Sequence, residues 1–161
     1  MLFLEHKGLY RQGYASSPEP DEGYVMPFGV AGIKKEGADI SLITYGALVQ
    51  KSLEAAKKME DRGTSVEVID LRTINPLDID SIYRSVRKTG KVVIAHEDTI
   101  TAGFGAEIAA LVAQNCFEHL DAPVRRVAAL DTPVPYSPPL ENVMLPGEAK
   151  ILVALEELAA Y

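Results

Sequence analysis

The sequence predicts an α/β fold, a three-layer α/β/α arrangement around a mostly parallel sheet. Two observations carry this prediction. Runs of β-branched residues, typical of buried strands, alternate with segments whose apolar residues recur at helical spacing, and glycine or proline separates many of these units. Strands joined by helices of ten or more residues pair in parallel through right-handed crossovers, so helices are expected on both faces of the sheet.

The expected elements follow one another along the chain. β-branched and apolar runs predict strands at residues 28–35, 39–45, 65–71, 91–96 and 124–130. Amphipathic spacing predicts helices at 47–62, 78–88, 104–120 and 148–160, and Gly63 stands where glycine commonly ends a helix. Residues 131–147 contain five prolines and are predicted to form a loop.

The first 27 residues differ in composition from the rest. Residues 1–5 are a short apolar run, and residues 13–27 combine three prolines with glycines and acidic residues. We therefore divide the chain into a leading strand and loop at residues 1–27 and an α/β domain at residues 28–161.

Composition excludes several classes of protein. With 161 residues, 47% of them hydrophobic, the chain is long enough for one globular core. Its 16 basic and 23 acidic residues give a net charge of −7, which argues against a nucleic-acid partner. No apolar stretch approaches the ~20 residues that span a bilayer, and the single cysteine, Cys116, excludes an internal disulfide. A soluble, cytoplasmic protein is expected.

Candidate functional residues stand where predicted strands end, since ligands of such sheets bind at the carboxyl ends of strands. Arg72 follows the strand at 65–71 and offers a fork of donors suited to a carboxylate or phosphate. The alternative is an ion pair of Arg72 with Glu97 or Asp98 that ties two loops together.

His96 and the residues after it form a second candidate group. A His beside Glu97 could act as a general base, although a hydrogen bond to a neighbouring loop explains it as well. Gly103 and Gly105 form a G-x-G turn that could bind phosphate through backbone N–H groups or could simply allow close packing. Arg72, His96, Glu97, Gly103 and Gly105 are thus a possible interface or anion site, and no metal-ligand spacing is found.

The segment 104–120 is apolar around most of its helical circumference. A helix of this kind must be buried on more than one side. The sequence leaves two alternatives open, a central position in the fold or an interface between subunits.

Six groups of residues, taken in order, resemble the β subunit of 2-oxo acid dehydrogenases, more narrowly its carboxyl-terminal half, the transketolase C-terminal domain. They are Leu2-Phe3-Leu4-Glu5-His6-Lys7 with Leu9-Tyr10-Arg11, Val68-Ile69-Asp70-Leu71-Arg72-Thr73 with Asn75-Pro76-Leu77-Asp78, Lys88-Thr89-Gly90, His96-Glu97, Leu120-Asp121-Ala122-Pro123, and Asp131-Thr132-Pro133-Val134-Pro135-Tyr136. The Leu-Tyr-Arg and Lys-Thr-Gly to His-Glu stretches look closer to the branched-chain, 2-oxoisovalerate type.

The resemblance implies a place in an enzyme that decarboxylates a 2-oxo acid on thiamine diphosphate and passes the acyl group to a lipoyl arm. It implies that thiamine diphosphate and Mg²⁺ are held by the α subunit and by the amino-terminal half of the β subunit. No catalytic, cofactor-binding or metal-binding residue is therefore assigned to this chain, which is expected to be inactive alone. The implied partners are those two parts, the lipoyl acyltransferase core and a second copy of the chain, with no membrane partner.

Three alternatives remain beside this interpretation. The chain could be the matching half of a pyruvate dehydrogenase β subunit or of a split transketolase. It could also be a free-standing α/β module that binds a small anion. Whether the chain is a fragment or a separately encoded half stays open at this point.

Overall fold

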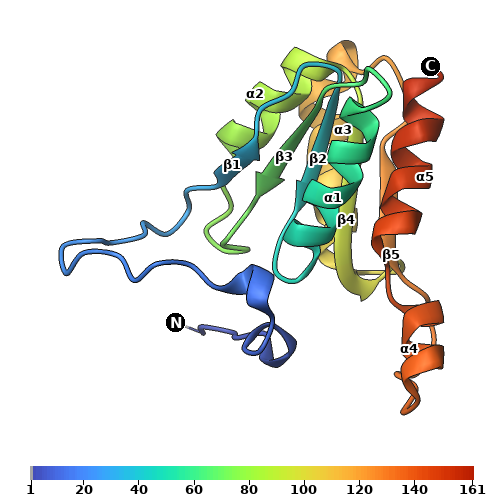
Figure 1. Ribbon diagram of the computed structural model, residues 1–161. Coiled ribbons are helices and arrows are strands. Elements are labelled where there is room, and N and C mark those ends of the chain that lie inside the picture. The colour runs from blue at the N-terminus through green and yellow to red at the C-terminus, as the bar shows by residue number, and fades with distance from the viewer. Residues whose placement is uncertain (1) are drawn as a thin grey trace.

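The computed structural model describes residues 2–161 and shows a five-stranded sheet between two layers of helices (Figure 1). The strands are β1 (Gly32–Lys35), β2 (Ile40–Thr44), β3 (Val66–Asp70), β4 (Val92–Thr99) and β5 (Arg125–Ala129). The helices are α1 (Leu48–Glu60), α2 (Ile79–Thr89), α3 (Phe104–Cys116), α4 (Pro138–Met144) and α5 (Glu148–Ala159), with 3₁₀ turns η1 (Lys7–Leu9), η2 (Gly13–Ala15) and η3 (Phe117–His119).

The sheet has the strand order β1-β3-β2-β4-β5 and is mostly parallel, as the sequence predicts. β2, β3, β4 and β5 pair in parallel, whereas β1 pairs antiparallel with β3. The reason is the connection between β1 and β2, which spans only residues 36–39. A connection this short reverses the chain and cannot carry the crossover that a parallel strand needs.

Two apolar clusters fill the space between the sheet and its helices. On one face Leu42 of β2 belongs to the cluster that contains Leu48 of α1 and Leu155 of α5. On the other face the next residue, Ile43, packs in the cluster formed with α2 and α3, which includes Ile108. Successive strand residues point to opposite faces, so a strand buried on both sides reads as a continuous apolar run.

α3 is buried on one side only. Its buried residues are Gly105, Ile108, Val112 and Cys116, whereas Ala110 is exposed on the opposite side. The alternative of a central position in the fold is therefore wrong for this helix within the described chain. The predicted helix 104–120 also ends early, because its last turn continues as the 3₁₀ turn η3.

Two segments differ from the sequence prediction. The loop predicted at 131–147 contains the helix α4, which begins at Pro138 because proline is favoured in the first helical turn, where its missing N–H removes no hydrogen bond. The strand predicted at the start of the chain is absent from residues 2–5, which lie exposed and unpaired beside the turns η1 and η2. An apolar run forms a strand only where another strand can pair with it.

The described helices include none that is both long and apolar enough to cross a membrane.

Gly37 lies in the short turn that passes over the start of β3, and this placement gives a first prediction. A Cβ at this position would overlap the backbone of Val66 and Glu67. We expect Gly37→Ala to lower the free energy of unfolding by about 1–3 kcal/mol, since backbone atoms must move to relieve the overlap. Gly13→Ala is the matched control, because no atom lies within 4 Å of the added Cβ. Urea unfolding of both variants tests the prediction, and equal stabilities would contradict it.

Candidate functional site

His96 lies on β4 with none of its surface exposed to solvent. Its ring is parallel to that of Tyr45, with centroids 6.4 Å apart, and Tyr45 in turn meets Phe104 edge-on at 6.3 Å. The imidazole is thus enclosed between the end of β2 and the first turn of α3. A ring without an exposed edge presents no nitrogen to a substrate, so the structure does not favour His96 as a general base.

The glycines of the G-x-G turn make room for this ring. A Cβ on Gly103 would come within 2.7 Å of His96 Cε1, and one on Gly105 would overlap His96 Nε2. The imidazole therefore occupies the space beside the first turn of α3 where a phosphate would have to approach the backbone N–H groups. Of the two interpretations of this turn, close packing is the one that the geometry supports.

The protonation of His96 follows from its surroundings. Burial lowers the pKa of His96, the nearby Asp98 carboxylate opposes this, and Arg126 adds to the lowering. Neither ring nitrogen has a hydrogen-bond partner among the described residues. An imidazolium without partners is costly to bury, so the ring is neutral near pH 7.

Arg72 does not join His96. It has a left-handed backbone conformation with φ of 58°, and its guanidinium lies over Gly32 of β1. β1 and β4 are separated in the sheet by β3 and β2, so the two candidates lie apart. The expected ion pair of Arg72 with Glu97 or Asp98 is absent between residues 2 and 161, and Glu97 instead contacts His6 Nε2 at 3.0 Å. That expectation was wrong because Arg72 turns toward the outer strand.

The structure brings only three of the five candidate residues together, His96, Gly103 and Gly105. Glu97 contacts His6 of the amino-terminal segment, and Arg72 lies at Gly32, away from the other four. Around the turn, Asp131 accepts hydrogen bonds from the N–H and the hydroxyl of Thr101, at 3.1 and 2.6 Å. Carboxylates at this edge would repel a small anion, so the arrangement does not favour an anion site.

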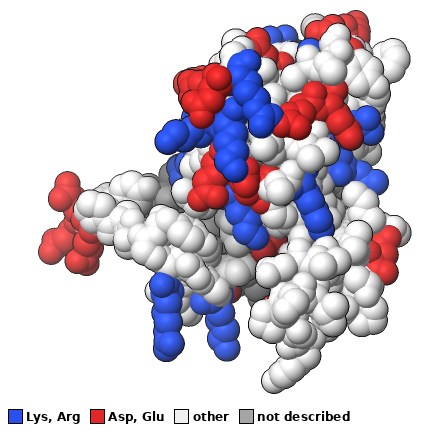
Figure 2. Space-filling model, turned by 45° about the vertical axis from the view of Figure 1, so that its right-hand side comes forward, with Lys and Arg blue, Asp and Glu red and all other residues white. Residues whose placement is uncertain are grey.

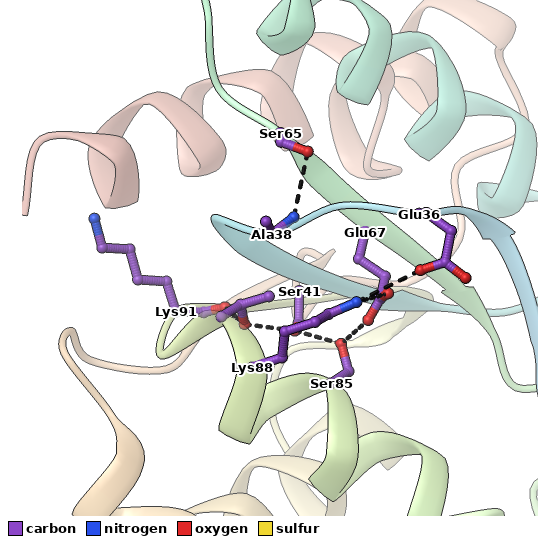
Figure 3. Close-up of polar contacts among 9 residues, drawn as sticks. Glu36, Ala38, Ser41, Ser65, Glu67, Ser85, Lys88 and Lys91 are labelled. Atoms are coloured by element: carbon purple, nitrogen blue, oxygen red, sulfur yellow. Dashed lines mark hydrogen bonds and ion pairs between the residues drawn. The ribbon is translucent and has the colours of Figure 1, made fainter.

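A buried polar network that the sequence did not reveal lies under α2 (Figure 3). Glu67 on β3 has 1% of its surface exposed and is bonded to Ser85 and Lys88 of α2. Ser41 on β2 bonds to Ser85 at 2.6 Å and to Thr89 at 2.7 Å. These contacts connect the last turns of α2 to β2, the central strand, and to β3 beside it.

The charge of Glu67 is stabilised in place. Burial alone would raise the pKa of Glu67, but the hydrogen bonds from Lys88 and Ser85 outweigh it and hold the pKa below its ordinary value. The pKa of Lys88 is correspondingly raised despite its own partial burial, through the hydrogen bond and the charge of Glu67. Because the carboxylate is enclosed and paired, the network serves packing rather than acid–base chemistry. One signal could have revealed it, an acidic residue inside the buried strand 65–71.

The described residues include no group of three or more His, Cys, Asp or Glu side chains placed to bind a metal ion. The fold and these contacts define an α/β domain in which buried polar residues connect the sheet to its helices. Residues 29–151 match the family "Transketolase, C-terminal domain", and the chain belongs to that family.

Two curated relatives extend this result over nearly the whole chain. The pyruvate dehydrogenase E1 component subunit beta of Staphylococcus epidermidis (strain ATCC 12228) is 49% identical over 152 residues, covering 94% of this chain and 46% of that protein. The protein of the same name from Staphylococcus aureus (strain MW2) is 46% identical over 161 residues, covering 100% and 49%. The chain thus spans about half the length of these relatives.

Two solved structures share the fold. A protein described as "Split gene transketolase, inactive beta4 tetramer" superposes with a TM-score of 0.74 at 27% identity, over 84% of this chain and 44% of that one. The 2-oxoglutarate:ferredoxin oxidoreductase from Magnetococcus marinus gives 0.51 at 12% identity, over 80% and 19%, which shows the fold alone. The predicted fold class is confirmed.

The buried His96 predicts a loss of stability in mild acid. The unfolded chain binds a proton at this residue near the ordinary His pKa of ~6.5, whereas the folded chain binds it only at lower pH. The unfolded state therefore takes up more protons as the pH falls below ~7, and stability decreases until the folded pKa is passed. We expect urea unfolding between pH 7.5 and 5.5 to show a steeper decrease for the wild type than for His96→Phe. Equal decreases in the free energy of unfolding for the two proteins would contradict the lowered pKa of His96.

Removing Lys88 should expose the cost of burying Glu67. We expect Lys88→Met to lower the free energy of unfolding by about 1–3 kcal/mol at pH 7, because a buried carboxylate loses a charged donor. Glu67→Gln in the same chain should restore part of the loss. Lys57→Met on the exposed side of α1 is the control, since no acidic partner of Lys57 is found in residues 2–161. Thermal unfolding measures all of these variants. Equal losses of stability in Lys88→Met and Lys57→Met would contradict a stabilising role of the Lys88–Glu67 pair.

Proposed function

We propose that this chain is the carboxyl-terminal domain of the β subunit of a thiamine-diphosphate-dependent 2-oxo acid dehydrogenase, where it serves assembly. The observation that carries the proposal is 46–49% identity, over 94–100% of the chain, to proteins named pyruvate dehydrogenase E1 component subunit beta. Membership in the transketolase C-terminal domain family agrees with it. The chain covers 46–49% of the length of those relatives, so we propose that a second polypeptide segment supplies the other half of the subunit.

The substrate that these names favour is pyruvate. The branched-chain expectation rests on short stretches such as Leu9-Tyr10-Arg11 and gains no support from the names of the relatives. Pyruvate is therefore our leading substrate, and 2-oxoisovalerate is the second arm of the test below.

The chain's own groups support an assembly role rather than a reacting one. Thiamine diphosphate supplies the decarboxylation chemistry of such enzymes when bound, but the residues here do not fit its diphosphate. The G-x-G turn is filled by His96, and the neighbouring carboxylates oppose an anion. We assign the cofactor and its Mg²⁺ to the α subunit and to the amino-terminal half of the β subunit.

The proposed partners are those two parts, the lipoyl acyltransferase core and a second copy of this chain. Self-association is supported by the solved relative described as an inactive beta4 tetramer, a homo-oligomer without a second kind of subunit. The same relative supports the second candidate function, the matching half of a split transketolase.

A chimera tests the proposed function. The corresponding residues of the Staphylococcus aureus β subunit are replaced by this chain and co-expressed with that organism's α subunit. We expect decarboxylation of pyruvate with thiamine diphosphate and Mg²⁺, and none from this chain by itself or from the β subunit truncated before the replaced residues. A second chimera, built in the same way on the β subunit of a branched-chain enzyme with its own α subunit, tests the alternatives. Activity of that chimera on 2-oxoisovalerate, with none from the pyruvate chimera, would restore the branched-chain interpretation, and inactivity of both would favour the split transketolase. Activity of the isolated chain would refute the assembly role.

A further inference from the structure

Residues 2–28 form a strap that few contacts attach to the domain. All of these residues are exposed except Leu9, which is half-buried. Among the hydrogen bonds and ion pairs of residues 2–161, one joins the strap to the rest of the chain, His6 Nε2 with Glu97 Oε2 at 3.0 Å. Figure 1 shows the strap extending from the end of the domain, and Figure 2 shows it projecting beyond the body of the molecule. The contact of His6 with Glu97 therefore decides where the strap lies.

This contact lies where the sheet changes the direction of its connections. In the order β1-β3-β2-β4-β5, α1 leads from β2 to β3 on one side, and α2 leads from β3 back across to β4 on the other side of β2. The carboxyl ends of β2 and β4 thus form the switch point, the place at which ligands of open α/β sheets bind. Glu97 lies near the carboxyl end of β4, so His6 attaches the strap at the switch point.

Among the described residues, the charged group that contacts His6 is the carboxylate of Glu97. Its charged neighbours in the strap are Lys7, which is exposed, and Glu5, whose carboxylate accepts the hydroxyl of a tyrosine of the strap. On β4, the carboxylate of Asp98 accepts a backbone N–H at 2.8 Å. A positive charge on His6 therefore strengthens the attachment to Glu97.

We propose that the strap is a pH-dependent cover of the switch point, attached while His6 is charged and released as His6 loses its proton. A charged imidazole forms an ion pair with Glu97, whereas a neutral one offers only a hydrogen bond, and charge-assisted hydrogen bonds are roughly twice as strong. Histidine ordinarily changes its charge between about pH 5 and 8. An exposed pair contributes little by itself, so a modest rise in pH is enough to release the strap. This inference goes beyond the proposed function and concerns the chain by itself.

The fluorescence of a single tryptophan measures the release. The chain contains no tryptophan, so Phe3→Trp, at a strap position that is 78% exposed, introduces one emitter that reports on the strap. We expect the anisotropy of this emission to decrease from pH 6 to pH 8, because the ratio of attached to released strap falls about twofold to fivefold when an exposed ion pair loses one charge. Circular dichroism at each pH establishes that the domain stays folded. An anisotropy that does not change with pH would overturn the proposal.

Three further substitutions, each combined with Phe3→Trp, assign the change to the pair. Glu97→Gln and His6→Gln should each remove the pH dependence of the anisotropy, since each leaves one member of the pair without a charge. His119→Gln is the matched control. His119 also contacts a glutamate, Glu118 at 3.6 Å, but it lies on η3, outside the strap. Its replacement should leave the pH dependence unchanged.

Three results would overturn the proposal even if the anisotropy changed with pH. The first is a pH dependence that persists in Glu97→Gln, and the second is one that disappears in His119→Gln. The third is a change in anisotropy that grows with protein concentration, which would assign it to association between copies of the chain. The activity of the chimera bears on none of these results, so the proposed function is tested separately.

Discussion

Enclosure of β2 on both faces and along both edges is the constraint around which the domain is built. All five of its residues are buried, and it pairs with β3 on one side and β4 on the other. A strand in this position needs a helical layer above and below, which the pairs α1/α5 and α2/α3 provide. Because these helices complete the core, fifteen large apolar side chains of residues 2–30 and 130–143 remain exposed.

Polar residues inside such a sheet must find partners within it, and the domain meets this requirement in two different ways. Glu67 is paired and hydrogen-bonded, so its charge fastens α2 to the strands at little net cost. His96 has no partner and is tolerated because it stays neutral and is enclosed by rings and glycines. Histidine and glutamate are common acid–base catalysts. Here neither side chain can reach a substrate, because Glu67 and His96 are both buried.

Repeated patterns in the sequence predict the strands and helices, whereas features that depend on a single long-range contact cannot be predicted from it. Strand and helix order followed from periodicity, because burial on two faces leaves a long apolar signature. The ion pair expected for Arg72 does not form, because its guanidinium lies at Gly32 of β1. No local sequence pattern predicts that β1 pairs antiparallel with β3 beside it. α4 was missed because proline is common both in loops and at helix starts. Ser41, Ser85 and Glu67 meet only in three dimensions, so their network could not be read from spacing.

The carboxyl end of the sheet bears on where we propose that the reacting groups lie. In open α/β sheets the carboxyl ends of the strands are the usual place for a ligand. Here that end carries a filled glycine turn, carboxylates already bonded to loop atoms, and two protruding apolar segments. Such an end is suited to a protein surface, which can cover apolar side chains over a wide area, and unsuited to a small anion. The half of the relatives that this chain does not span is therefore where we expect the reacting groups to lie.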